Sequence, residues 1–140
     1  MVGCRSAKRG FSMADEKPAE LVERCAQFGE TAIRFAKGVK RSVITNPLIS
    51  QLVRSATSVG ANYCEAKNAS SRKDFFHRVS IAQREALEAK HWLRMIVAAD
   101  DEYRAEARNL WKEANELHLI LSSILVRRVQ PERTDDPLQE

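Results

Sequence analysis

Residues 48–99, LISQLVRSATSVGANYCEAKNASSRKDFFHRVSIAQREALEAKHWLRMIVAA, decide the fold of this 140-residue chain. Apolar side chains recur in this stretch at alternating intervals of three and four residues. The first set is Ile49, Leu52, Ala56, Val59, Tyr63 and Ala66, and the second is Phe75, Val79, Ala82, Ala86, Ala89, Leu93 and Ile96. Such spacing puts each set on one face of a helix. The stretch therefore predicts two long amphipathic helices joined by a tight polar turn.

The same spacing continues on both sides of this stretch, so that four helices are expected at about residues 19–41, 47–68, 72–99 and 102–129. Side chains that favour helix starts precede the last three of them. These are Asn46 before Pro47, Ser71 three residues before Asp74 in the manner of a capping box, and Asp100 or Asp101.

Short connections place successive helices side by side in opposite directions. A composition of 44% hydrophobic residues with only 5 Gly and 4 Pro agrees with a helical protein. The predicted fold is therefore all-α, an up-down-up-down antiparallel four-helix bundle that occupies residues 19–130 as one domain. Residues 1–18 are predicted to be a disordered N-terminal arm, and residues 131–140 a flexible acidic tail.

Cysteine usage and hydropathy indicate the compartment. Cys4, Cys25 and Cys64 are scattered and form no metal-binding pattern, which suits a reducing environment. The first residues lack the apolar run of a secretory signal, and the apolar run 117–126 is about half the length of a membrane span. We expect a cytoplasmic protein that does not contact membranes.

Two of the helices carry more apolar side chains than one buried stripe requires. The additional residues are Phe76, Leu87, Trp92, Trp111, Ile120, Leu125 and Val126. A helix with a widened apolar stripe usually packs on two sides, which predicts a homo-oligomer. The alternative is that these residues only widen the core of a monomer.

A polar stripe runs beside the apolar face of the helix at 47–68. It consists of Ser55, Ser58, Asn62 and Glu65, with Arg54 able to reach an acidic partner and Glu88 on the next helix. We interpret these residues as a hydrogen-bond network that fixes helix register, because no nucleophile and base converge as catalysis requires. The sequence therefore predicts no enzyme activity and no cofactor.

A metal site is the competing interpretation. Glu88 and His91 are spaced like the carboxylate and histidine ligands of di-iron bundles, and Asp74 and His77 repeat that spacing. Such sites need these pairs on two different helices at one level, whereas both pairs here lie on one helix, about 21 Å apart. A bundle metalloprotein is the disfavoured alternative.

Basic residues gather near the predicted helix ends. The candidate nucleic-acid contacts are Arg34, Lys37, Lys40 and Arg41, then Arg72 and Lys73, then Arg127 and Arg128. In the predicted bundle the first group lies at one end and the others at the opposite end. Oligomerisation would multiply each group into a ring of charge that holds phosphates without reading bases.

The run L-x-x-Q-L-x-R-S-A-x-S-V-x-x-N-x-x-E at 48–65, K-D-F at 73–75 and I-A-x-x-E-A-x-E at 81–88 resemble the 23S rRNA intervening-sequence protein family. This family is also called the four helix bundle protein or S23 ribosomal protein family. The motif positions are Arg54, Ser55, Ser58, Asn62, Glu65, Lys73, Asp74, Phe75 and Glu88. Ala66 departs from the family's usual Gly, and Arg84-Glu85 from its usual Gly-Ser pair.

The resemblance implies a small bacterial bundle that assembles into a ring, typically a homopentamer. Members are often encoded within 23S rRNA genes, and a related accessory protein of diversity-generating retroelements uses a basic pentameric barrel to contact nucleic acid and a reverse transcriptase. We therefore expect a non-enzymatic oligomeric scaffold associated with RNA or a nucleoprotein complex. The alternative is a protein-interaction adaptor whose basic residues are only solvated surface.

Overall fold

A computed structural model describes residues 18–127, in which every regular element is helical. The four long helices are α1 (Pro18–Gly38), α2 (Thr45–Lys67), α3 (Arg72–Ala99) and α4 (Arg104–Val126), and a short 3-10 helix, η1 (Asp101–Tyr103), precedes α4. The prediction of an all-α chain with four helices is confirmed for this range. The predictions for residues 1–17, for the last helical residues up to 129 and for the acidic tail lie outside the described residues.

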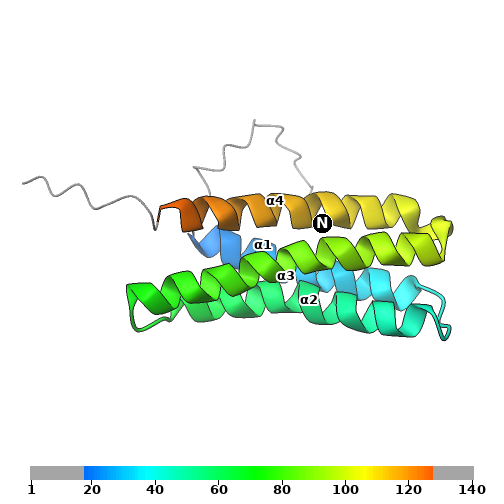
Figure 1. The fold of residues 1–140 in the computed structure, drawn as a ribbon, viewed down its shortest axis with the longest axis horizontal. Coiled ribbons are helices and arrows are strands. Elements are labelled where there is room, and N and C mark those ends of the chain that lie inside the picture. Colours follow the sequence, from blue (N-terminus) through cyan, green and yellow to red (C-terminus); the bar gives the residue numbers. More distant parts are fainter. Residues whose placement is uncertain (1–17, 128–140) are drawn as a thin grey trace, which may run out of the picture.

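The helices lie side by side along one long axis, and the three connections between them fall at alternate ends (Figure 1). α2 packs against α1 and α3, and α3 packs against α2 and α4, whereas α1 and α4 contact each other over a smaller area. Two ion pairs between α2 and α3 join residues that follow one another in opposite order along the two helices. Arg54 of α2 contacts Glu85 of α3, while Glu65, further along α2, contacts Arg78, earlier on α3.

The core follows the stripes of the sequence closely. All twelve apolar residues that recur at this spacing in the first two predicted helices are buried, although the last of the first set, Val39, directly follows α1. They are Leu21, Cys25, Phe28, Ala32, Phe35, Val39, Ile49, Leu52, Ala56, Val59, Tyr63 and Ala66. Phe76 and Ile120, which the spacing placed outside the main stripes, are also buried, with 8% and 2% of their surfaces exposed. Phe75 is half-buried instead and meets the Phe76 ring edge to face, at 5.3 Å between centroids. The widened stripe is thus partly core.

The start of α3 is as the sequence predicts. Ser71 Oγ accepts a hydrogen bond of 3.1 Å from the backbone N–H of Asp74. The carboxylate of Asp74 in turn accepts one from Ser70 Oγ, also at 3.1 Å. Ser71 therefore supplies one of the acceptors that the free amide groups of a helix start require.

The start of α2 differs from the prediction. The helix begins at Thr45, and Asn46 lies within it rather than capping it. Ser42 Oγ accepts from the backbone N–H groups of Ile44 and Thr45, at 3.2 and 3.0 Å, and Thr45 Oγ1 donates to the carbonyl of Lys40 at 2.7 Å. The side chain of Ser42, three residues before Thr45, therefore takes the place of the expected cap at Asn46, and the helix starts earlier.

The other boundaries shift for similar local reasons. α1 ends at Gly38, earlier than the predicted end at position 41. Two residues later, the backbone N–H of Lys40 donates to Tyr103 Oη at 2.8 Å. Asp100 accepts from the N–H of Glu102 at 3.0 Å, so that this aspartate caps η1, and α4 follows only from Arg104.

Candidate functional site

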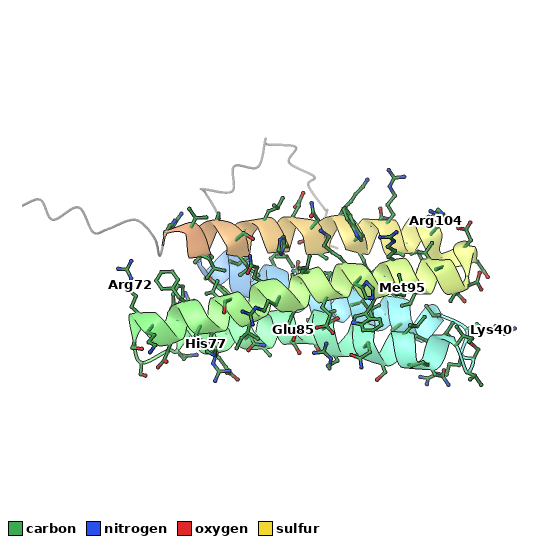
Figure 2. The ribbon with its side chains drawn as sticks, viewed as in Figure 1. Lys40, Arg72, His77, Glu85, Met95 and Arg104 are labelled. Carbon is green, nitrogen blue, oxygen red and sulfur yellow. The ribbon has the colours of Figure 1, made fainter. Side chains whose placement is uncertain are left out.

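An ion-pair cluster centred on Arg54 joins α2 to α3. Its guanidinium donates to Glu85 Oε2 at 3.0 Å and also contacts Glu88, whose Oε1 accepts from Trp92 Nε1 at 3.1 Å. The acidic partner expected for Arg54 is therefore present twice. Glu85, which sequence reasoning noticed only as a departure from the family pattern, is one of the two. Glu85 lies in the middle of the molecule between α3 and α2 (Figure 2).

The cluster shifts the pKa values of its members. Burial alone raises the pKa of Glu88, but hydrogen bonds from Arg54 and Trp92 outweigh it and hold the pKa below its ordinary value. The hydrogen bond to Glu88 also raises the pKa of Arg54, against a smaller effect of burial. Both groups are therefore charged at neutral pH and act as a fixed pair.

Ser55, Ser58 and Asn62 do not form the expected network between helices. In the described part of the chain their side chains donate only to carbonyl groups of α2, namely those of Leu52, Arg54 and Ser58. Short polar side chains reach the carbonyl of the preceding helical turn more easily than they reach a neighbouring helix. Contact between α2 and α3 at this polar stripe instead comes from Arg54 and from Glu65, which pairs with Arg78 at 2.6 Å.

The remaining motif residues lie at the start of α3. Lys73 and Asp74 are exposed there, and Phe75 is half-buried. Asp74 belongs to the cap described above. These three motif residues thus lie in the first turn of α3, away from the Arg54 cluster.

The proposed metal-ligand pairs do not converge. Glu88 is engaged by Arg54 and Trp92, and His91 stacks edge to face on Trp92 with 5.0 Å between ring centroids. Within residues 18–127, no group of three or more His, Cys, Asp or Glu side chains is arranged to hold a metal ion. The same range contains no helix long and apolar enough to span a membrane.

The basic clusters lie at both ends of the molecule. Figure 2 places Lys40 at one end and Arg72 at the other, so that the clusters of α1 and α3 are separated by the length of the helices. Arg127 follows α4 at the same end as the start of α3 (Figure 1). Arg72 lies over the Phe76 ring at 5.4 Å, and Arg128 lies outside the described residues.

A surface runs along the contact between α3 and α4 and is here called the α3–α4 seam. The widened apolar stripe of the sequence included its residues Leu87, Trp111 and Val126, but neither Leu119 nor the polar pairs. Gln83 Nε2 donates to Ser122 Oγ at 2.8 Å, and Lys90 Nζ donates to Asn115 Oδ1 at 2.9 Å. Large apolar side chains are exposed beside these pairs: Leu87 (50%), Trp111 (39%), Leu119 (44%) and Val126 (62%). Leu119 follows Trp111 by eight residues and precedes Val126 by seven, and this spacing was the available signal.

On the other side of α4, a groove of about 1010 Å³ separates it from α1. Four carboxylates line this α1–α4 groove: Glu20, Glu23, Glu106 and Glu113. Arg24 crosses it and binds Glu113 Oε1 at 2.6 Å together with Glu116. The two sides of α4 therefore differ. The side of the seam carries exposed apolar residues and Lys90, and the side of the groove carries an excess of carboxylates.

Comparison with known proteins agrees with this geometry. The sequence profile described as 23S rRNA-intervening sequence protein matches residues 18–123. The chain belongs to this family. A crystal structure from the S23 ribosomal protein family, of a Bacteroides thetaiotaomicron protein with unknown function, is similar at a TM-score of 0.67 and 28% identity. The match covers 75% of this chain and 97% of that one. No curated protein matches the chain.

Family membership confirms the resemblance that the motifs of α2 and α3 indicated. The matched range, residues 18–123, contains the first three helices and nearly all of α4. The Arg54 cluster therefore lies within the part that defines the family, and the motif identifies a relationship and a fold without naming a reaction.

Proposed function

We propose that this chain is an up-down-up-down antiparallel bundle that forms a homo-oligomer, and that the assembly is a non-enzymatic cytoplasmic scaffold for RNA or a nucleoprotein complex. The opposite order of residue pairs along α2 and α3 supports the topology. Among the described residues, Cys25 and Cys64 form no disulfide, which suits a reducing compartment.

The observation that carries the assembly is the α3–α4 seam. Leu87, Leu119 and Val126 each expose between 44% and 62% of their surface. The Gln83–Ser122 and Lys90–Asn115 hydrogen bonds bracket Leu87 and Leu119 along their helices, which places the two leucines at the same level. Apolar side chains gathered in this way on one face favour burial against another protein surface. A second copy of the chain supplies such a surface by symmetry.

The polar motif supports a scaffold rather than an enzyme. Arg54, Glu85 and Glu88 bind one another, while Ser55 and Ser58 donate to the backbone of their own helix. These groups therefore stabilise the contact between α2 and α3. The charge available for a polyanion lies instead at the ends of the helices, where Arg34, Lys37 and Lys40 are exposed.

The test is the dependence of RNA affinity on salt. We expect log affinity for single-stranded RNA to fall linearly with log salt, because each neutralised phosphate releases counterions. Reversal of Arg34, Lys37 and Arg41 to Glu should flatten the slope by about 0.7 for each phosphate that the variant no longer neutralises. Each of the three reversals is also made singly and compared with Arg84→Glu, which makes the same change of charge at an exposed position of α3.

A protein-interaction adaptor is the second candidate, and the α1–α4 groove favours it. Four carboxylates and two arginines, Arg24 and Arg34, line this groove. The excess of carboxylates attracts a basic peptide segment, for which Phe28, Phe35 and Leu110 provide an apolar lining. Absence of RNA binding at low salt, together with capture of a basic peptide in this groove, would establish the adaptor and exclude the RNA scaffold.

A further inference from the structure

A second, smaller groove lies on the α3–α4 seam at the end where α3 leads into η1. Its volume is about 460 Å³, which is within the usual range of small-molecule sites. Leu93 and Ala107 line it and are almost completely buried, with 1% and 2% of their surfaces exposed. Val97 and the indole of Trp111 extend this apolar lining toward the surface. We call this groove the arginine notch.

Three arginines, Arg94, Arg104 and Arg108, complete the lining, and no carboxylate belongs to it. Nε of Arg104 is 2.7 Å from Asp101 Oδ1, so that this guanidinium is already neutralised in part. Arg94 and Arg108 are exposed and make no ion pair with any residue that the structure describes. Two unneutralised guanidinium groups beside an apolar floor attract a ligand that is anionic at one point and apolar at another.

Trp111 is held in place at the inner end of the notch. Lys90 Nζ lies 4.6 Å from the centre of its ring, and a hydrogen bond to Asn115 fixes the ammonium group. The indole nevertheless remains 39% exposed. A rigid aromatic side chain that is partly uncovered next to arginines provides the stacking surface on which single-stranded nucleic acids place their bases.

From these contacts we infer that the arginine notch binds one unpaired nucleotide of a single-stranded RNA. The base lies on the apolar floor against Trp111, and the adjoining phosphate is bound by Arg94 and Arg108. This inference rests on the RNA association proposed above and adds a site that the clusters at the helix ends do not include. A nucleotide joins a planar ring to a phosphate at short range and so fits both parts of the lining. An isolated phosphate makes no use of the apolar floor, and an acidic peptide makes no use of the indole.

The position of the notch also fits the rest of the molecule. Arg104 and Lys40 lie at the same end of the bundle (Figure 2), and Lys40 is linked to η1 through its hydrogen bond to Tyr103. A strand with one nucleotide in the notch can therefore continue toward the basic end of α1. The α1–α4 groove, although larger, is lined by four carboxylates against two arginines and is therefore less suited to a phosphate.

The test uses the full chain with Trp92→Phe, which leaves Trp111 as the only tryptophan. Titration with a single-stranded uridine decamer should quench Trp111 fluorescence in a saturable manner. The variants are compared by the fluorescence anisotropy of a labelled decamer, which needs no tryptophan in the protein. The double variant Arg94→Glu, Arg108→Glu should weaken decamer binding at least tenfold, and Trp111→Ala by about tenfold, while Trp111→Phe retains most of the affinity. Arg84→Glu, which reverses one exposed arginine of α3 outside the notch, should have little effect.

Circular dichroism shows whether each variant is folded. If Trp111→Ala does not fold, the double arginine variant still tests the proposal, because both of its substitutions are at exposed positions. If the double arginine variant binds the decamer as tightly as the parent protein, the nucleotide site in the notch is contradicted, but the proposed RNA association is not. Absence of any decamer binding to the parent protein would overturn both. Equal quenching by inorganic phosphate, or by a polyaspartate peptide of equal length, would overturn the assignment to a nucleotide.

Discussion

At the scale of single residues, Arg54 is the most connected polar side chain of the family motif. It bridges to Glu85 and Glu88 across the contact between α2 and α3, and Trp92 donates to the same Glu88 oxygen that Arg54 contacts. The side chains of Arg54 and Glu88 remain 44% and 38% exposed. A partly exposed pair of this kind contributes below about 1 kcal/mol, so that its main effect is to orient the two helices.

Replacement of Glu88 by Gln should change the response of stability to acid. The pKa of Glu88 is lower in the folded state than in the unfolded chain, so that the unfolded chain binds the proton first. The stabilising effect is present above the ordinary pKa of Glu, near 4.5, and is lost as pH falls through the lower folded value. Chemical denaturation at pH 7 and at pH values below 4.5 measures the free energy of unfolding. Between these pH values it should decrease less in Glu88→Gln than in the parent protein.

Glu116→Gln is the matched control on the other side of the bundle, because this carboxylate also contacts an arginine but has more exposed surface, at 56%. An equal change in acid sensitivity from both variants would contradict a specific role of Glu88.

At the scale of elements, α1 and α2 approach each other closely at two glycines. A Cβ atom at Gly60 would lie 3.4 Å from the carbonyl carbon of Cys25, and one at Gly29 would lie 3.5 Å from the Cα of Thr57. Both distances are ordinary van der Waals contacts. A methyl group is therefore accommodated at either position, whereas a larger side chain meets the backbone of the opposite helix.

Gly60→Ala should stabilise the protein by about 0.5–1 kcal/mol, because alanine favours a helix over glycine and its methyl group fits. This corresponds to a rise in Tm of about 2–6 °C. Gly60→Leu should lower Tm, because its branched side chain forces α1 and α2 apart. Thermal unfolding followed by circular dichroism compares the two. A lower Tm for Gly60→Ala would show that the helices are already at their closest possible approach.

At the scale of the whole molecule, α4 separates two unlike surfaces. Its contact with α3 carries exposed apolar side chains and the arginine notch, and the space between it and α1 carries carboxylates. The smaller contact area between α1 and α4 leaves that space open as a groove. The assembly proposed above covers the apolar part of the seam, at Leu87, Leu119 and Val126, and leaves the notch at the end of the bundle.

Leu119→Glu should dissociate the oligomer while each bundle stays folded, because the charge enters the proposed contact but not the core. Light scattering should then give the mass of one chain, 15.9 kDa, with helical content unchanged. Ile33→Glu is the control, since Ile33 is similarly exposed, at 40%, but lies on α1. A parent protein that is already monomeric at micromolar concentration, or equal dissociation by both variants, would contradict assembly through the seam.

The sequence by itself determined the four helices, their buried stripes and the cap at Ser71, because helix periodicity and capping depend on residues within a few positions of one another. Its motifs also identified the family. Only the tertiary structure decided that Phe76 and Ile120 belong to the core, that Glu85 pairs with Arg54, and that Arg94 and Trp111 line the same groove. These facts depend on how far each helix is rotated and shifted against its neighbour. That arrangement is set by the packing of all the side chains together, which no local pattern records.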